Sequence, residues 1–243
     1  MNLKNISRLV RKNRLLNKII LFDSIDSTNK YLMENDFASG TVVAARTQSL
    51  GRGKQGAKWV SGKGGLWFSF VINKKIVNPY MFVVAASVAV TETMAGCGIK
   101  PAIKWPNDIL VGSSKICGIL IENDSFNGRI VTGIGINLNN SIPRGLNAIS
   151  LKTAAKKHVD EEEFFVKLLK KLDLYVSGIN TLKKKLVALW VKNQADITGR
   201  EISVIRHNKK EFGRVKKVNK DGSVRVKMDS GKTLRIKGEV FFL

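Results

Sequence analysis

Short apolar runs separated by turn residues fill the chain up to about residue 150. Runs of this length, rich in Val, Ile, Leu and Phe, are typical of buried β-strands. Asn127-Gly128, a strong signal for a hairpin turn, separates the last two of them. The pattern predicts strands at Lys18–Phe22, Thr41–Arg46, Leu66–Asn73, Lys115–Glu122 and Arg129–Asn137.

Other segments carry helix signals. The Ser27-Thr28 pair, Pro79 and the acidic run Asp160–Glu163 each suit the first turn of a helix. Apolar residues then recur with helical spacing, which is most simply explained by faces that pack on a core. The predicted helices lie over 28–35, 79–97, 160–176 and 181–193.

From Ile197 onward the period changes to an alternation of apolar and polar residues. Turns at Asp221-Gly222 and Ser230-Gly231 separate the alternating segments. Short strands are predicted at Glu201–Ile205, Gly213–Val218, Ser223–Met228 and Thr233–Ile236. Their number favours a small SH3-like β-barrel. The chain of 243 residues would then hold two domains, 1–196 and 197–243, with 1–17 as a basic, amphipathic lead-in.

The net charge of +23 points to anionic partners without naming them. The basic excess is concentrated at the two ends; residues 197–243 carry thirteen Lys and Arg against five acidic residues. A nucleic-acid binder would show such an excess. So would an enzyme that binds ATP, pyrophosphate and an acidic protein surface. The charge alone does not choose between them.

Compartment and membrane signals are weak. The longest apolar run, Met81–Val90, is too short to span a bilayer, and the N-terminus lacks the pattern of a secretory signal. Cys97 and Cys117 follow no metal-ligand spacing. We therefore expect reduced thiols and a cytoplasmic protein.

Gly51-Arg52-Gly53-Lys54-Gln55-Gly56 is the first candidate for chemistry. Its glycines allow positive φ angles, so that backbone N–H groups turn towards one point, and Arg52 and Lys54 add cations. Such a loop suits a phosphate or a carboxylate, although a solvated turn is the simpler interpretation by composition. The spacing also matches the dinucleotide fingerprint. No helix signal follows Gly56, however, so the Rossmann interpretation is excluded.

A second group follows further along the chain. Lys104-Trp105-Pro106-Asn107-Asp108 interrupts an apolar run with a turn. Its Lys suits a phosphate, its Trp can stack on a base, and its Asp can help to hold Mg²⁺. Lys115 stands at the mouth of the next apolar strand, where it is either an edge charge or an anion ligand. Gly133 and Gly135, inside a predicted strand, indicate close approach of another group to the backbone.

The order of these segments is more specific than any one of them. Five segments follow one another in the chain: Asp26-Ser27-Thr28-Asn29, Gln48 with Gly51-Arg52-Gly53, Lys104–Asp108, Lys115–Leu120 and Gly135-Ile136-Asn137. In this the chain resembles biotin protein ligases over roughly residues 18–150, and again over 197–243, where that family carries a small barrel. The resemblance implies an α+β fold, with a mixed β-sheet that has helices packed on one side, followed by the SH3-like domain.

The resemblance also implies an activity and a set of site residues. Biotin and MgATP would give biotinoyl-5′-AMP, and the biotin would pass to a lysine of a biotin carboxyl carrier domain. Arg52 and Lys115 would be the catalytic residues, and Mg²⁺ would come with ATP, with Asp108 as a candidate ligand and no dedicated protein cage. The implied biotin-binding residues are Ser27, Thr28, Asn29, Gln48, Arg52, Gly53, Lys54, Lys115 and Gly118. The implied ATP- or adenylate-binding residues are Arg52, Lys54, Trp59, Lys104, Asn107, Lys115 and Asn137.

Two departures from the family pattern matter. Lys54, Gln55 and Ala57 stand where the family loop often has arginines, and a lysine lacks the bidentate fork of arginine. We therefore expect a looser hold on the adenylate. Residues before Lys18 are too few for the N-terminal winged helix of many relatives, so we expect a ligase without specific DNA binding.

Two alternatives stay open at this point. A lipoate-type acyl-carrier ligase shares the fold, and a basic nucleic-acid-binding module would use the C-terminal barrel. Glycines in the 51–56 loop predict mobility without ligand and ordering with it. A further hypothesis is that the barrel helps ATP binding or docking of the carrier, and deletion of 197–243 would test that role. The sequence also leaves open whether the chain forms a homodimer through a sheet edge.

Overall fold

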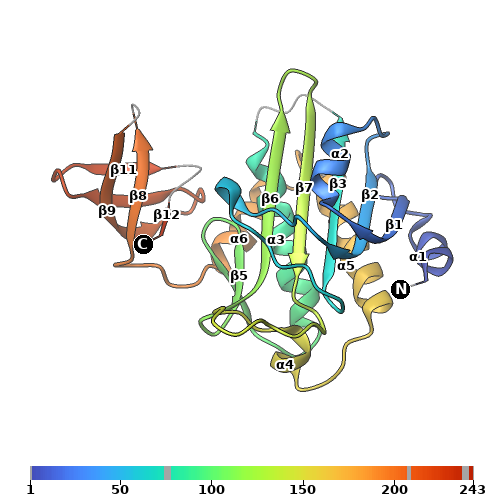
Figure 1. The fold of residues 1–243 in the computed structure, drawn as a ribbon. Helices are drawn as coiled ribbons and strands as arrows, with labels where there is room; N and C mark the ends of the chain where they lie inside the picture. Colours follow the sequence, from blue (N-terminus) through green and yellow to red (C-terminus); the bar gives the residue numbers. More distant parts are fainter. Residues whose placement is uncertain (1, 74–77, 207–208, 237–240, 243) are drawn as a thin grey trace.

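A seven-stranded mixed sheet organises the first 196 residues of the chain (Figure 1). The computed structural model describes residues 2–73, 78–206, 209–236 and 241–242. The strand order is β1-β2-β3-β7-β6-β5-β4; β1 and β2 run parallel and every other neighbouring pair is antiparallel. The strands are β1 (Lys18–Ile25), β2 (Thr41–Gln48), β3 (Leu66–Asn73), β4 (Pro101–Lys104), β5 (Asp108–Val111), β6 (Ser114–Asp124) and β7 (Arg129–Ile136).

One face of this sheet is covered by long helices. Helix α3 (Tyr80–Ala95) lies between the sheet and two outer helices, α5 (Glu161–Ser177) and α6 (Lys183–Lys192). Because α3 is covered on both sides, it is apolar around its whole circumference. Phe68 of β3 meets Phe165 of α5 edge to face, with the ring centroids 5.0 Å apart. Two shorter helices complete this part, α1 (Leu3–Val10) and α4 (Leu151–Ala155).

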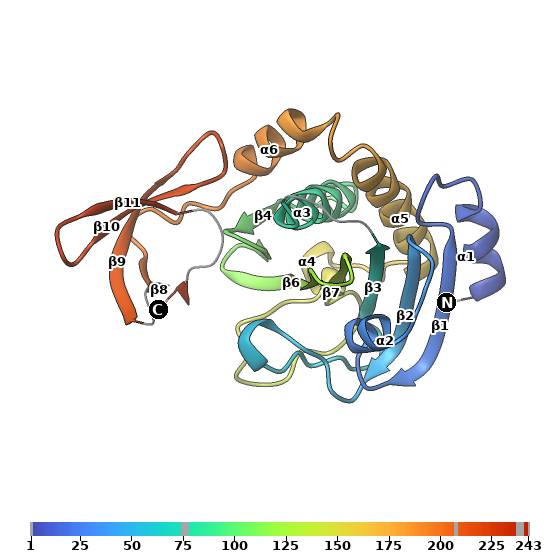
Figure 2. The ribbon, with the colours of Figure 1, turned by 90° about the horizontal axis from the view of Figure 1, so that it is seen from above.

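Helix α2 (Thr28–Glu34) lies on the opposite face (Figure 2). The expectation of helices on one side only is therefore wrong. The physical reason is that the central strands are apolar on both faces. Leu32 of α2 packs on Val43, Val71 and Val131, which alternate along β2, β3 and β7 with the side chains that face α3. The site described below begins at this second, smaller core.

The C-terminal sheet has five antiparallel strands in the order β11-β10-β9-β8-β12. Val224, Val226 and Met228 of β10 point inward and the residues between them are exposed, so the predicted alternation is confirmed. Strand β9 begins four residues before its predicted start, and β12 was not predicted. The strands are β8 (Glu201–Arg206), β9 (Lys209–Val218), β10 (Val224–Met228), β11 (Thr233–Ile236) and β12 (Phe241–Phe242).

The two sheets share one continuous apolar core. Trp105 donates a hydrogen bond from Nε1 to the carbonyl oxygen of Gly222 in the β9–β10 turn, 3.0 Å away. Trp190 of α6 packs beside the same glycine. A domain boundary at 196–197 therefore stays a prediction.

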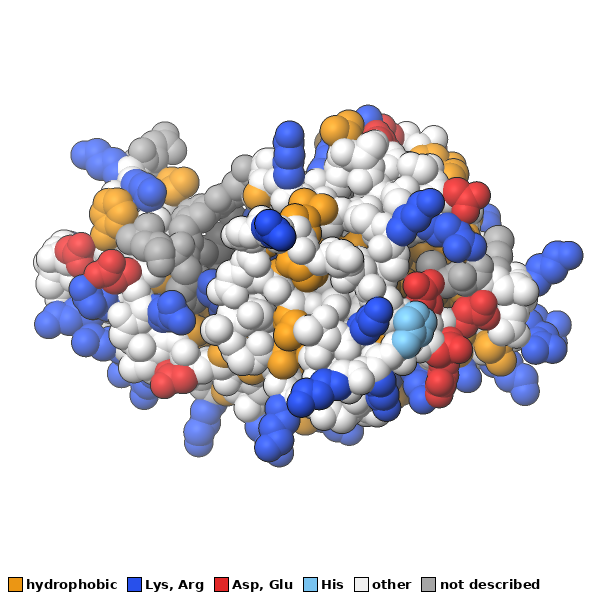
Figure 3. Space-filling model, turned by 60° about the horizontal axis from the view of Figure 1, so that its bottom comes forward, with side chains coloured by type: hydrophobic (Ala, Val, Ile, Leu, Met, Phe, Trp, Pro, Cys, Tyr) orange, Lys and Arg blue, Asp and Glu red, His pale blue; other side chains and the backbone are white. Residues whose placement is uncertain are grey.

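Cationic side chains are spread over the surface. In Figure 3 they project at both ends and along the lower edge, with acidic side chains between them. The charge of this face forms no single patch. None of the helices in the described ranges is long and apolar enough to cross a membrane.

Candidate functional site

A cavity of about 340 Å³ opens at the start of α2. The 52–59 loop, residues 104–108 and the middle of β3, β6 and β7 complete its lining. A volume of this order is within the range of small-molecule sites. It gathers thirteen of the residues that the sequence singled out: Ser27, Thr28, Asn29, Gln48, Arg52, Gly53, Lys54, Trp59, Lys104, Asn107, Asp108, Lys115 and Gly118.

Asn137 is not among the residues that line this cavity. It lies just past the end of β7 and is buried, with 6% of its surface exposed. Its side-chain oxygen accepts a hydrogen bond from Nδ2 of Asn140, and its backbone N–H donates to Ile116. These two bonds connect the end of β7 to β6 and to Asn140.

The 51–59 loop is a small hairpin closed by its own backbone. Trp59 N–H donates to the carbonyl of Gly51 at 2.9 Å, and Gly53 N–H donates to that of Ala57 at 2.6 Å. Ala57 N–H is also bonded within the loop, to Lys54. The sequence predicted N–H groups turned towards one point, but these three are paired inside the loop. Gly51 is required here because a Cβ would lie 2.3 Å from the carbonyl oxygen of Trp59.

Interior glycines of β6 and β7 make room for side chains from other elements. A Cβ on Gly135 would lie 2.5 Å from Nε1 of Trp59, and one on Gly118 would lie 2.9 Å from its ring. A Cβ on Gly133 would lie 2.1 Å from Oδ1 of Asn29. The predicted close approach is confirmed, and protein side chains make it. Trp59 thus lies flat across two strands, at the mouth of the cavity.

Polar side chains that hydrogen-bond to one another form the end of the cavity beside α2. Ser27, Thr28 and Asn29 are each less than 5% exposed, and Ser69 of β3 is fully buried. Ser69 Oγ donates to Asn29 Oδ1 at 2.5 Å and contacts Thr28 Oγ1 at 2.7 Å. The backbone N–H of Thr28 donates to Gln48 Oε1 at 2.9 Å. Buried polar groups of this kind keep a fixed geometry, because an unpaired partner is costly.

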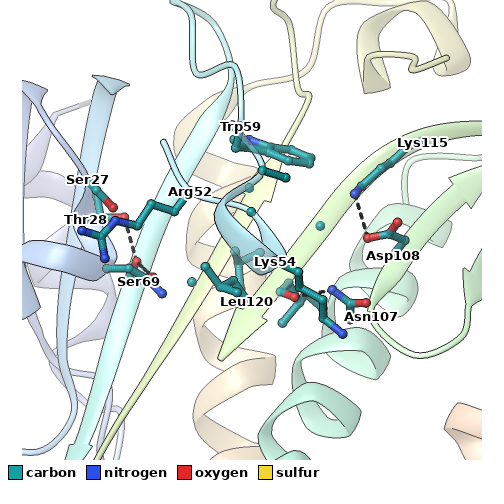
Figure 4. A pocket seen from close by; sticks show the side chains of 18 of the residues that line it. Ser27, Thr28, Arg52, Lys54, Trp59, Ser69, Asn107, Asp108, Lys115 and Leu120 are labelled. Atoms are coloured by element: carbon teal, nitrogen blue, oxygen red, sulfur yellow. Dashed lines mark hydrogen bonds and ion pairs between the residues drawn. The ribbon is translucent and has the colours of Figure 1, made fainter. Parts of the chain in front are cut away.

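The opposite end of the cavity carries charge (Figure 4). Lys115 Nζ lies 2.8 Å from the carboxylate of Asp108 and 4.9 Å from the centroid of the Trp59 ring. Asn107 donates from Nδ2 to the carbonyl of Ile119, 2.6 Å away, which fixes the 104–108 turn against β6. In Figure 4 the loop with Arg52, Lys54 and Trp59 lies between this charged end and the polar end, where Thr28 and Ser69 are in contact. A ligand with a polar head and an anionic tail fits such a distribution.

Titration of two groups near the site is shifted for clear reasons. The hydrogen bond from the Lys30 ammonium, with help from Ser27 N–H, lowers the pKa of Asp26. This ion pair supports the first turn of α2, where Ser27 caps the helix. Burial raises the pKa of the Cys117 thiol, which makes it a poor nucleophile. Cys117 is buried and Cys97 partly buried, and both are free thiols.

Sequence reasoning missed two residues of this region. Ser69 lies inside a strand that is otherwise apolar, and a lone hydroxyl at a buried position was the available signal. Glu122 accepts hydrogen bonds from Asn29 at 2.8 Å and Arg52 at 3.3 Å. Nothing in the local sequence distinguishes it from a solvated charge at a strand end.

The residues fit a metal only when phosphates supply most of its ligands. Within the described part of the chain no group of three or more His, Cys, Asp or Glu side chains gathers. Asp108 offers one carboxylate at the charged end of the cavity. Mg²⁺ in nucleotide sites is commonly held by one or two carboxylates plus phosphate oxygens and water. Asp108 would fit that arrangement together with a nucleotide.

Comparison with known proteins decides the family. The model of the biotin/lipoate A/B protein ligase family matches residues 21–140. This part of the chain belongs to that family. It contains every residue of the cavity lining, from Ser27 to Gly135.

Curated relatives include ligases, some of which carry biotin in their names. The bifunctional ligase/repressor BirA of Bacillus subtilis is 36% identical over 157 residues, which are 58% of this chain and 48% of that protein. The chain thus spans about half the length of that relative. The biotin–[acetyl-CoA-carboxylase] ligase of Paracoccus denitrificans is 26% identical over 89% of this chain and 97% of its own length.

A solved structure agrees over nearly the whole chain. The biotin protein ligase of Aquifex aeolicus, in complex with biotin and ATP, superposes with a TM-score of 0.81 at 27% identity. The match covers 93% of this chain and 98% of that one. The mixed sheet, its helices and the small C-terminal sheet therefore form the fold of a biotin ligase, as expected from the sequence.

Proposed function

We propose that this protein is an ATP-dependent biotin ligase. In this proposal it joins biotin to AMP with release of pyrophosphate, and then transfers the biotin to a lysine of a biotin carboxyl carrier protein. The observation that carries it is the cavity of family residues 21–140, with a polar end at Thr28–Ser69 and a cationic end at Lys115. The names of the Paracoccus denitrificans relative and of the Aquifex aeolicus structure favour biotin over lipoate.

The polar end suits the ureido head of biotin. A urea group offers one carbonyl acceptor and two N–H donors, so it needs both kinds of partner. Ser27, Thr28, Asn29 and Gln48 carry hydroxyl and amide groups that supply both. In the proposal these four residues hold the head. Gly118, which also lines the cavity, admits the Trp59 ring beside β6.

The cationic end suits the reacting groups. In the first step an oxygen of the biotin carboxylate attacks the α-phosphorus of ATP, and the bond from phosphorus to the pyrophosphate oxygen breaks. Negative charge accumulates there, and preorganised cations lower the barrier. Lys115 and Arg52 are the proposed catalytic residues, and Gly53 and Lys54 place the loop over the adenylate.

The nucleotide side is assigned to the remaining lining residues. Trp59 offers an aromatic surface, and Lys104 and Asn107 offer polar contacts to adenine or phosphate. Mg²⁺ would arrive with ATP and be held by its phosphates, with Asp108 as the protein ligand. Asn137 is left out of this assignment, because it does not line the cavity.

Partner, assembly and location belong to the same proposal. The acceptor would be a carrier domain of a biotin-dependent carboxylase in the cytoplasm, and no specific DNA site is proposed. If the chain dimerises through a sheet edge, β1 is the candidate. Residues 193–195 already hydrogen-bond along β4 at the other edge, through Ile103. Light scattering on the purified protein measures this.

The test is biotin-dependent exchange of labelled pyrophosphate into ATP. Wild type should catalyse the exchange, and Lys115→Ala should lower it by about 100-fold, as for the loss of a group that stabilises transition-state charge. Lys157→Ala removes an exposed lysine outside the cavity and should leave exchange unchanged. Lipoate in place of biotin should give no exchange. Exchange with lipoate alone, or none with either acid, contradicts the proposal.

A further inference from the structure

The loop at the mouth of the cavity is connected to the polar end by an unbroken series of hydrogen bonds. On one side Arg52 Nη1 lies 3.3 Å from Glu122 Oε1, and the other carboxylate oxygen accepts from Asn29 Nδ2 at 2.8 Å. From Asn29 the series passes through Ser69 to Thr28. It continues through Gln48 and Ser61 to the carbonyl oxygen of Trp59, at the far end of the loop. Both ends of the loop are therefore held by the same network.

Counting protons gives this network a direction. Ser69 has one hydroxyl proton and donates it to Asn29 Oδ1, which leaves Thr28 as the donor in the 2.7 Å contact between the two hydroxyls, in place of its longer 3.1 Å contact with Gln48 Oε1. Gln48 Oε1 still has a donor, the backbone N–H of Thr28. From Thr28 through Ser69 and Asn29, each donor points towards the carboxylate of Glu122. Hydrogen bonds aligned in this way reinforce one another when they end on a charge.

The carboxylate therefore fixes which way the Asn29 amide faces. A carboxylate only accepts, so it holds the NH₂ group of Asn29 and leaves the carbonyl to Ser69. A reversed amide would place two acceptors against each other at Glu122. The pattern of donors and acceptors that a ligand head meets at Asn29 thus depends on Glu122, which does not line the cavity itself.

We propose that Glu122 is a positioning residue that orients Asn29 for the head of biotin and anchors Arg52 of the loop with the same carboxylate. The identity of the ligand rests on the proposed function; the hold on the loop does not. Glu122 and Arg52 side chains are 27% and 44% exposed, and such a pair adds little to global stability. Its loss should therefore loosen the loop and weaken ligand binding while the fold stays intact.

Glu122→Gln tests this, because it keeps the shape and removes the charge. Calorimetry should show biotin binding about tenfold weaker, a loss typical of a charge-assisted hydrogen bond. KM for biotin should rise more than kcat falls. Trypsin cleaves after Arg52, Lys54 and Lys58, all in the loop, and cleavage there should be at least about threefold faster without ligand. Glu34→Gln, at an exposed carboxylate on α2, should match wild type in both measurements.

A second variant separates the two tasks of Glu122. In Arg52→Gln the loop has already lost its anchor, so adding Glu122→Gln should not speed cleavage after Lys54 and Lys58 any further. The added change should still weaken biotin binding through Asn29.

Several outcomes overturn the proposal. Unchanged loop cleavage in Glu122→Gln removes the anchor, and unchanged biotin affinity removes the role at Asn29. A fall in melting temperature well beyond that of Glu34→Gln would show a merely structural role. If wild type binds no biotin, the proposed function fails, and the cleavage rates still decide the hold on the loop.

Discussion

Strand β3 of the large sheet and strand β10 of the C-terminal sheet place their polar residues in opposite ways. In the large sheet, Ser69 and the side chains at the start of α2 are buried and bonded to one another beside glycines that admit them. In the C-terminal sheet, β10 alternates between buried apolar residues and exposed Arg225 and Lys227. The first sheet has a cavity at its polar residues; the polar residues of β10 face solvent.

This difference shows where chemical information lies in the molecule. Charge is densest in the C-terminal part, yet an exposed cation on a strand carries little information, since water can satisfy it. A buried hydroxyl is costly without a partner, so a bonded one such as Ser69 constrains several elements at once. The binding site is thus found where polarity is costly rather than where it is abundant.

Gly133→Ala disrupts the hydrogen-bonded polar end of the cavity and has the largest expected effect. Its new Cβ would lie 2.1 Å from Oδ1 of Asn29, so that side chain must leave its place. We expect biotin affinity, measured by calorimetry, to fall by at least about 100-fold through loss of the head contacts. Gly62→Ala, where a Cβ meets nothing within 4 Å, is the control. Wild-type affinity in Gly133→Ala would mean that Asn29 does not contact the ligand.

Trp105→Phe tests how strongly the two regions are joined. It removes the hydrogen bond to Gly222 and leaves that carbonyl without its partner. The free energy of unfolding in urea should fall by about 1–2 kcal/mol more than in Trp190→Phe. Trp190 is an equally buried control whose Nε1 has no partner among the described residues. Equal losses in the two variants would show that this bond contributes nothing.

Arg225→Glu tests whether like charges on neighbouring strands destabilise the C-terminal sheet. Arg225 lies opposite Lys217 on one neighbouring strand and Arg235 on the other, and like charges in such positions repel. A glutamate there should raise the free energy of unfolding by about 0.5 kcal/mol at low salt and by less at high salt. Lys220→Glu, in a turn, makes the same charge change without a cross-strand partner. Equal gains in both would point to net charge instead.

Asp26→Asn has the smallest expected effect, and it is confined to pH. The pKa of Asp26 is lower in the folded protein than its unfolded-state pKa, near 3.8. The carboxylate therefore stabilises the fold at pH values above the unfolded-state pKa, and this contribution disappears as the pH falls through the folded-state pKa. Wild type should therefore be more stable than the variant at pH 7, and the gap should close below about pH 4. Thermal melts between pH 2 and 7 measure it, and a gap that persists at pH 2 contradicts this cause.

Much of the fold followed from local signals. Strand runs at 18–22, 66–73 and 129–137 were confirmed, as was the hairpin at Asn127-Gly128. Asp160 caps its helix by accepting a hydrogen bond from the N–H of Glu163, as the acidic run predicted. Local signals sufficed because turns and caps depend on residues three or four positions apart.

The sequence by itself determined most of the strands and the longer helices, because these leave a pattern within one segment. The order of the family motifs along the chain also singled out thirteen residues that line the cavity. Only the tertiary structure decided that α2 lies on the second face, that Asn137 falls outside the lining and that Glu122 joins the site. Asn29 and Glu122 are 93 residues apart in the chain, and Arg52 and Glu122 are 70 apart. Contacts over such distances depend on strand order and register, and no local pattern encodes them.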